Sequence, residues 1–191
     1  MNTLQNDVKN VSAYLVKKQK AFDSVTDLTR DIIRGAAQAI TMVHAEDKKA
    51  AKRILLSTYN SVKKLNTFGA EFEYYMRQAC QEYAEAKIFY EITESGKIPS
   101  YREIHVDQEA YLLGLMDVMG ELKREILEEL RKENYKRADA HFEKMKLIYD
   151  TTRSLRFAEA VLAGFRRKQD TARIQLENAG SELLSFKNKG K

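Results

Sequence analysis

Four carboxylates stand at helical spacing in two separate stretches of the chain. Glu82 and Glu85 lie in "QACQEYAEAKIFYEI", in a row that is otherwise filled by small and aromatic side chains. Asp117 and Glu121 lie in "YLLGLMDVMGELKREI", four residues apart, and therefore share one face of a helix. Acidic pairs on helices most often belong to a solvated surface. A site for chemistry is the sharper alternative, because both rows otherwise consist of residues that pack.

The two acidic pairs lie at similar distances from one loop. Gly96 and Pro99 mark the only strong loop signal in the chain. From a midpoint near residue 100, Glu85 lies about 15 residues back and Asp117 about 16 residues on, at a rise of about 1.5 Å per helical residue. If the connection is a simple hairpin, both pairs reach the same height and face one another across one groove.

Four carboxylates in a small volume repel one another unless they are protonated or bridged by cations. Hard oxygen ligands favour Mg²⁺ or Mn²⁺, while the scarcity of His and Cys disfavours zinc. No histidine follows a glutamate by three residues, as a di-iron bundle requires. A carboxylate-held Mg²⁺ activates water and stabilises the charge of an in-line phosphoryl displacement. The predicted reaction is therefore phosphodiester hydrolysis, with Gly114 and Gly120 leaving room for close approach beside the acids.

The elements that must position these acids are all helices. One proline, eight glycines and no tryptophan in 191 residues leave few breaks, and apolar residues recur at helical spacing. Asp107 and Asn134 are expected N-caps, and Gly164 is expected to break the chain before the last helix. The predicted fold is a single-domain bundle (1–191) of about six to seven helices with a basic, flexible tail at 187–191. Helices are expected at residues 6–44, 46–66, 68–94, 108–132, 134–161 and 165–186.

The first helix is too long for a compact bundle of this size. We therefore expect its apolar stripe, which includes Val11 and Leu15, to serve a partner subunit as well, so that the protein is an oligomer. No run of 18 apolar residues and no secretory signal is visible. Cys80 has no second cysteine to pair with, and we expect it to be a buried hydrophobe in a cytoplasmic protein.

The net charge of +5 is modest, and it permits a polyanionic partner without demanding one. Arg124 lies three residues after Glu121 and could hold a phosphate or pair with the acids. The stretch "RRKQDTAR" gathers further candidates for nucleic-acid binding, although a solvated face with internal ion pairs is the more ordinary reading. These candidates are Arg166, Arg167, Lys168 and Arg173. No spacing links His44, His105 and His141, which disfavours a histidine acid and base pair.

Two motifs resemble the translin family, and in particular its Trax branch: "QEYAEA" (81–86) and "YLLGLMDVMGEL" (111–122). "LTRDIIRGAAQAITMVH" and "FRRKQDTARIQLENAGSEL" are similar to the first and last helices of that family, so the resemblance covers nearly the whole chain. It implies an all-α fold that assembles into hollow octamers and binds single-stranded RNA or DNA. The long linker of eukaryotic Trax is shortened here to "SGKIPSYREIHV", which suggests a compact prokaryotic or archaeal member.

In the Trax branch, acids at the motif positions act in metal-dependent endoribonuclease chemistry. Carried over by motif, these catalytic and metal-binding residues are Glu82, Glu85, Asp117 and Glu121. The expected protein is thus an Mg²⁺- or Mn²⁺-dependent endoribonuclease acting on single-stranded RNA. The alternative is a non-catalytic binder of single-stranded RNA or DNA of the translin type. The sequence leaves open whether the chain assembles alone or with a translin-like subunit.

Overall fold

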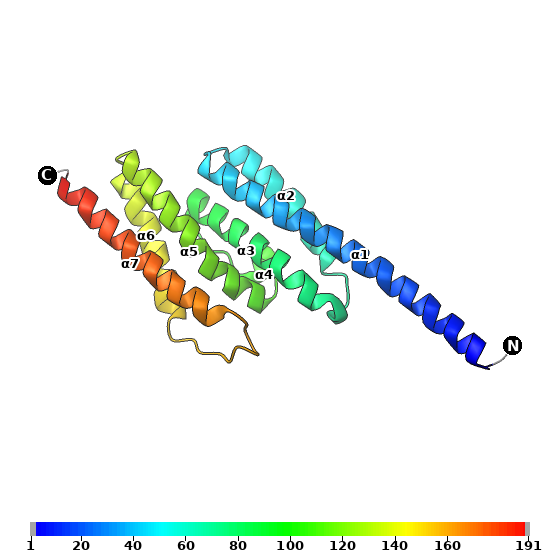
Figure 1. The fold of residues 1–191 in the computed structure, drawn as a ribbon. Coiled ribbons are helices and arrows are strands. Elements are labelled where there is room, and N and C mark those ends of the chain that lie inside the picture. Colours follow the sequence, from blue (N-terminus) through cyan, green and yellow to red (C-terminus); the bar gives the residue numbers. More distant parts are fainter. Residues whose placement is uncertain (1–2, 190–191) are drawn as a thin grey trace.

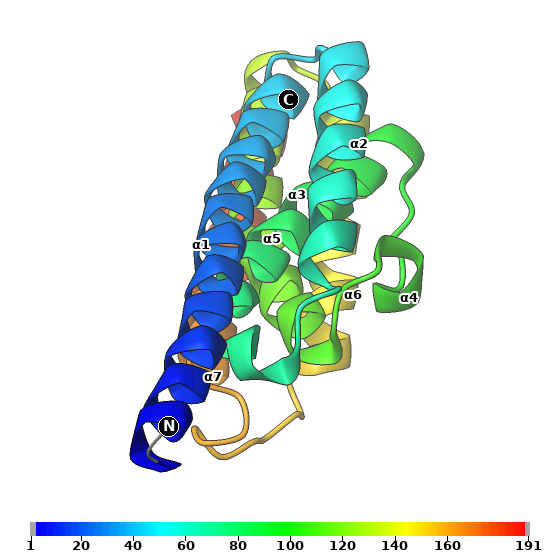
Figure 2. The same ribbon diagram turned by 90° about the vertical axis from the view of Figure 1, so that its right-hand side faces the viewer.

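The protein is a layered bundle of helices, as a computed structural model that describes residues 3–189 shows (Figure 1). The described residues contain no strand, which confirms the all-α prediction. Helices α1 and α2 form one layer, α3 lies in the middle, α5 packs on α3, and α6 and α7 pack on α5 (Figures 1 and 2). The elements are α1 (Thr3–His44), α2 (Lys48–Leu65), η1 (Ala70–Phe72), α3 (Glu73–Ser95), α4 (Tyr101–Ile104), α5 (Gln108–Arg131), α6 (Tyr135–Thr152) and α7 (Phe165–Lys189).

The helix ends follow the capping signals of the sequence. The carboxylate of Asp107 accepts a hydrogen bond from the backbone N–H of Ala110 at the start of α5. The side chain of Asn134 accepts one from the backbone N–H of Arg137 at the start of α6. Gly96 ends α3 in the left-handed conformation, with φ of 70°. Both predicted N-caps and the predicted stop of α3 are thereby confirmed. The short helix α4, which begins with a capping box at Ser100, was not predicted.

Helix α6 is shorter than the sequence predicts, because it ends at Thr152 and not at residue 161. Side chains take up the carbonyl groups at this end: Gln169 donates to the Thr152 carbonyl at 2.8 Å, and Arg156 donates to the Arg153 carbonyl at 2.7 Å. Phe157 consequently lies in the α6–α7 connection and is 47% exposed.

The last helix is longer than predicted. It continues through Lys189 and so includes most of the segment 187–191 that was expected to be a flexible tail. Lys187 forms an ion pair with Asp139 of α6, at 2.7 Å, which ties this end of α7 to the bundle. The last part of that predicted tail, 190–191, lies outside the described residues.

The N-terminal half of α1 projects beyond the rest of the bundle (Figure 1). All residues from 3 to 20 are exposed, and the first fully buried side chain of the helix is Val25. Leu15, expected in a packed stripe, is 54% exposed, and Val11 is 56% exposed. No helix of the described chain is long and apolar enough to cross a membrane.

Candidate active site

Three of the four predicted acids line one pocket between α3, α5 and α7. The pocket has a volume of about 500 Å³. Glu82 and Glu85 reach it from α3 and Asp117 reaches it from α5, so the expected juxtaposition of the two motifs is confirmed. The remaining lining residues are Gln81, Met116, Arg167, Lys168, Thr171 and Gln175.

Gly114 allows α3 and α5 to approach closely beside the acids. A Cβ atom at this position would lie 2.9 Å from the Cβ of Ala84 and 3.0 Å from the backbone nitrogen of Glu85. These distances are shorter than two carbon or nitrogen atoms tolerate, so every larger residue would force the helices apart. The glycine is thus a packing requirement of the site, as the sequence suggested.

The pocket favours the protonated form of Glu85. Burial first, and then the charges of Asp117, Glu82 and Glu121, together raise the pKa of Glu85 to about 8. Burial and the charge of Asp117 also raise the pKa of Glu82. The carboxylates therefore interact strongly with one another, which is the condition under which a cation is bound most tightly.

Asp117 is held by two neighbours. The Lys168 ammonium donates to Oδ1 at 2.5 Å, and the Gln81 carboxamide donates to Oδ2 at 2.7 Å. Both carboxylate oxygens of Asp117 thus have a partner in this structure. Lys168 was predicted to bind nucleic acid, and in this structure its ammonium forms an ion pair with Asp117 of the acid cluster.

Glu121 is held by a histidine that sequence reasoning passed over. His44, at the end of α1, contacts Glu121 at 2.6 Å through Nε2 and Glu125 at 3.1 Å through Nδ1. Burial alone would lower the pKa of His44, but its hydrogen bonds with the two carboxylates outweigh burial and raise it. No spacing in the sequence indicates this contact, because 77 residues separate His44 from Glu121.

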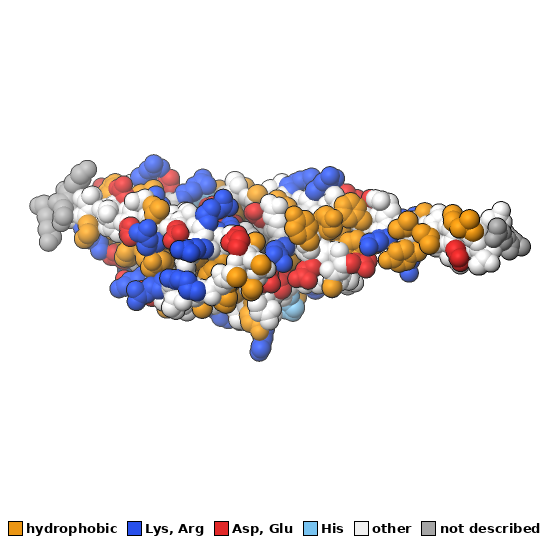
Figure 3. Space-filling view, turned by 60° about the horizontal axis from the view of Figure 1, so that its bottom comes forward, with side chains coloured by type: hydrophobic (Ala, Val, Ile, Leu, Met, Phe, Trp, Pro, Cys, Tyr) orange, Lys and Arg blue, Asp and Glu red, His pale blue; other side chains and the backbone are white. Residues whose placement is uncertain are grey.

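The predicted nucleic-acid-binding residues do not form one group. Arg167 is exposed and lines the acidic pocket together with Lys168, whereas Arg124 and Arg166 are exposed and do not line it. Arg173 is exposed and is paired with Glu177 of its own helix at 2.9 Å. In the view of Figure 3, lysine and arginine side chains gather on the half of the molecule nearer the C-terminus.

Gln175 is a further pocket residue that the sequence analysis did not single out. Its carboxamide oxygen is buried and has no hydrogen-bond partner in the described residues. Its Nε2 would lie 3.1 Å from a Cβ atom at position 120, so Gly120 makes room for this amide. The signal in the sequence is the helical spacing of Arg167, Thr171 and Gln175, which places all three on one face of α7.

The carboxylates of the pocket are of the chemical type that binds the predicted ion, but they are not arranged around a common point as its ligands. Carboxylate oxygens are the ligands that Mg²⁺ and Mn²⁺ prefer. Among residues 3–189, however, no group of three or more His, Cys, Asp or Glu side chains converges as a metal site. An ion would therefore have to draw the carboxylates together and displace partners that they now have.

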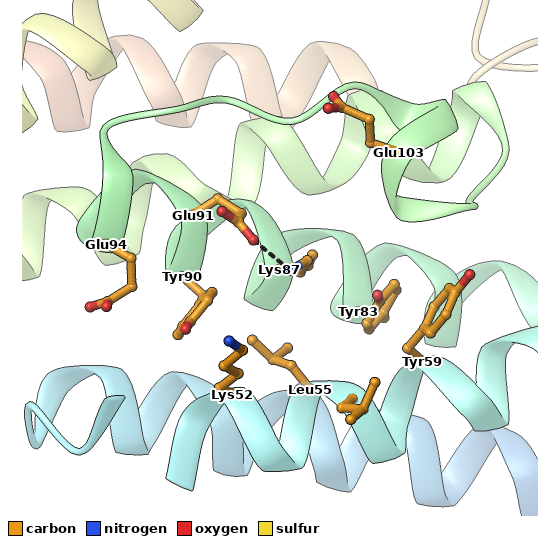
Figure 4. Close-up of a pocket in the computed structure, with 10 residues that line it drawn as sticks. Lys52, Leu55, Tyr59, Tyr83, Lys87, Tyr90, Glu91, Glu94 and Glu103 are labelled. Atoms are coloured by element: carbon orange, nitrogen blue, oxygen red, sulfur yellow. Dashed lines mark hydrogen bonds and ion pairs between the residues drawn. The ribbon is translucent and has the colours of Figure 1, made fainter. Parts of the chain in front are cut away.

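A second pocket, of about 460 Å³, lies between α2 and α3 and holds none of the four acids (Figure 4). Its carboxylates are paired with lysines: Glu91 with Lys87 at 2.5 Å, and Glu94 with Lys48 at 3.0 Å. Glu82 and Glu85, by contrast, form no ion pair within residues 3–189, so the pocket that they line with Asp117 is the stronger candidate site.

Comparison with known proteins supports a common origin with an archaeal protein and a shared fold with C3PO. No protein-family model matches the chain. The uncharacterized protein MJ0175 of Methanocaldococcus jannaschii is 34% identical over 177 residues, which is 91% of this chain and 79% of MJ0175.

Three solved structures superpose over nearly the full length, each at 24% sequence identity. A structure of AfC3PO in complex with duplex RNA has a TM-score of 0.87 and covers 96% of this chain and 97% of its own. The crystal structure of AfC3PO has a TM-score of 0.85, with 96% and 98% covered. That of apo-NeC3PO has a TM-score of 0.81, with 97% and 98% covered. The chain therefore belongs to one family with MJ0175, and its fold is the translin/Trax-like fold of C3PO.

Proposed function

We propose that this protein is a metal-dependent endoribonuclease that hydrolyses phosphodiester bonds of single-stranded RNA within a homo-oligomer. One observation carries the proposal: Glu82, Glu85 and Asp117 line one pocket, where burial and the charges of the neighbouring acids together raise the pKa of Glu85 to about 8. A protein that kept these acids for solubility would expose them separately.

In the proposed mechanism, Glu82, Glu85, Asp117 and Glu121 would hold Mg²⁺ or Mn²⁺. The ion, when bound, supplies an activated water and stabilises the charge that develops on the phosphate. Glu85 would have to release its proton to water before it could serve as a ligand, and His44 holds Glu121 through a contact of 2.6 Å. Arg167, exposed at the pocket, is placed to contact the phosphate backbone. Contacts of this kind read the backbone and not the bases, so sequence specificity should be weak.

The oligomer is proposed from the projecting half of α1. A helix that exposes Val8, Val11, Leu15 and Val16 leaves apolar surface that a second copy would bury. The family resemblance suggests a hollow octamer. AfC3PO has been crystallised with duplex RNA, so the test below includes both single-stranded and duplex substrates.

The decisive test compares cleavage of labelled RNA by the wild type, Glu85→Gln and Asp117→Asn, with Mg²⁺, with Mn²⁺ and with a chelator. We expect each substitution to lower the rate by about 100-fold or more, since each removes a charged ligand. Glu91→Gln is the matched control, because Glu91 stands on the same helix but lines the other pocket. Undiminished cleavage in the chelator or in both variants would contradict the proposal.

A non-catalytic RNA- or DNA-binding oligomer is the second candidate. The observation in its favour is that Lys168 and Gln81 already bind both carboxylate oxygens of Asp117, so that this side chain is not free to bind a metal ion. In that case RNA would stay intact in Mg²⁺ and Mn²⁺, while the shift of a labelled oligonucleotide would weaken steeply with salt.

A further inference from the structure

The ion pair between Lys168 and Asp117 is the feature that the proposed function leaves unexplained. The Lys168 ammonium lies 2.5 Å from Oδ1 of Asp117, and the side chains of the pair are 25% and 22% exposed. A surface ion pair would be loose and solvated, but this one is largely withdrawn from water and lines the same pocket as Glu82 and Glu85.

Lys168 acts on the whole cluster and not on Asp117 alone. Its charge lowers the pKa of Glu85 and of Glu82, against the burial and the acidic neighbours that raise them. One ammonium thus offsets part of the repulsion among three carboxylates. A divalent ion on the same carboxylates would do this more strongly, and it would be repelled by an ammonium held at 2.5 Å from one of its ligands.

We propose that Lys168 is the built-in counter-ion of the acidic pocket: it occupies Asp117 in the absence of a divalent ion and is released when one binds. The released ammonium is then free to bind the phosphate of the substrate, at the end of a flexible four-carbon chain. This inference rests on the proposed metal site. In this scheme Lys168 binds first Asp117 and then the substrate phosphate, whereas its neighbour Arg167 binds only the phosphate.

Arg167 supplies the matched control. It stands next to Lys168 on α7 and lines the same pocket, yet within the described part of the chain its guanidinium forms no ion pair with an acid. Lys168→Met and Arg167→Met therefore remove the same charge from the same pocket. Only the first removes a competitor for Asp117.

The test measures Mn²⁺ binding to the full chain by titration calorimetry, without RNA. We expect Lys168→Met to bind Mn²⁺ about tenfold more tightly than the wild type, and Arg167→Met to gain about threefold at most, from its charge alone. A second readout is thermal stability. Lys168→Met should melt below the wild type in a chelator and recover most of that difference in saturating Mn²⁺, because the ion replaces the lost ammonium.

Cleavage gives a third readout at saturating Mn²⁺, where Lys168→Met should turn over RNA more slowly than the wild type, because it lacks the ammonium that would bind the phosphate. Equal Mn²⁺ affinity in the wild type and Lys168→Met would overturn the exchange while leaving the metal site intact. Absence of Mn²⁺ binding in all three proteins would overturn the metal site, and the exchange with it.

Discussion

At the scale of single residues, the site depends on a histidine that joins two carboxylates. The side chains of His44 and Glu125 are 7% and 4% exposed, and Arg137, at 3.8 Å, is a more distant partner of Glu125. Burial would raise the pKa of Glu125, but the hydrogen bond with His44 and the charges of His141, His44 and Arg137 outweigh it and lower the pKa. A buried carboxylate of this kind is stable only while its partners remain.

We therefore predict that His44→Ala destabilises the protein by about 3 kcal/mol, because it leaves a buried charge without its nearest partner. Urea denaturation at neutral pH measures the effect. His105→Ala is the control, since His105 is exposed and its ring forms a hydrogen bond with the backbone carbonyl of Glu103 and not with a carboxylate. A loss within about 0.5 kcal/mol of that control would show that Glu125 is adequately held without His44.

His141 makes stability depend on pH. Its Nε2 is buried and has no hydrogen-bond partner among residues 3–189, and burial lowers its pKa below the ordinary value of 6.5. The folded state thus binds a proton less readily than the unfolded state, so stability is complete above about pH 6.5 and declines as the pH falls below it. We predict that His141→Met loses less stability between pH 7 and pH 5 than the wild type does. Parallel losses in urea denaturation at both pH values would contradict this assignment.

At the scale of helices, the site depends on the contact between α3 and α5. Gly114 sets this distance, because the space for its Cβ is already taken by Ala84 and by the backbone of α3. Moving one helix would separate Glu85 from Asp117, although neither side chain had been altered.

We predict that Gly114→Ala destabilises the fold by about 2 kcal/mol through overpacking and weakens Mn²⁺ binding at the same time. Gly69→Ala is the matched control, because the nearest atom to its Cβ would be 4.0 Å away. Urea denaturation and Mn²⁺ calorimetry measure both effects. Wild-type affinity in a destabilised Gly114→Ala would show that ion binding tolerates a wider spacing of the helices.

At the scale of the whole molecule, the projecting half of α1 is incomplete in a single chain. Figure 3 shows hydrophobic side chains along this end, and Val8, Val11, Leu15 and Val16 line one shallow pocket on it. A long isolated helix is marginal in water unless its apolar face is covered.

We predict that the double substitution Val11→Glu and Leu15→Glu dissociates the proposed oligomer, because it places two charges on the surface that a second copy would bury. Light scattering during gel filtration should give the mass of one chain for this variant and a multiple of it for the wild type. Asn10→Glu with Ala13→Glu adds the same charge on the opposite face of α1 and should leave the mass unchanged. A wild type with the mass of one chain would refute the oligomer itself.

The sequence by itself determined the long helices and the juxtaposition of the two acidic motifs. Helical periodicity and local caps specify α3 and α5, and equal distances from one loop place Glu85 and Asp117 at the same height on them. Such inferences succeed because capping and periodicity depend on neighbours within a few residues along the chain. They did not predict the end of α6, because the carbonyl of Thr152 accepts a hydrogen bond from Gln169 of another helix, α7.

Only the tertiary structure decided which partners the acids have. His44 meets Glu121 across 77 residues of sequence, and Lys168 meets Asp117 across 51. No local rule specifies such pairs, because their distance is set by the packing of α1 and α7 against the middle of the bundle. The physical reason is that a charge interacts through space with whatever the fold brings near it, whereas helices are encoded by residues that are already adjacent.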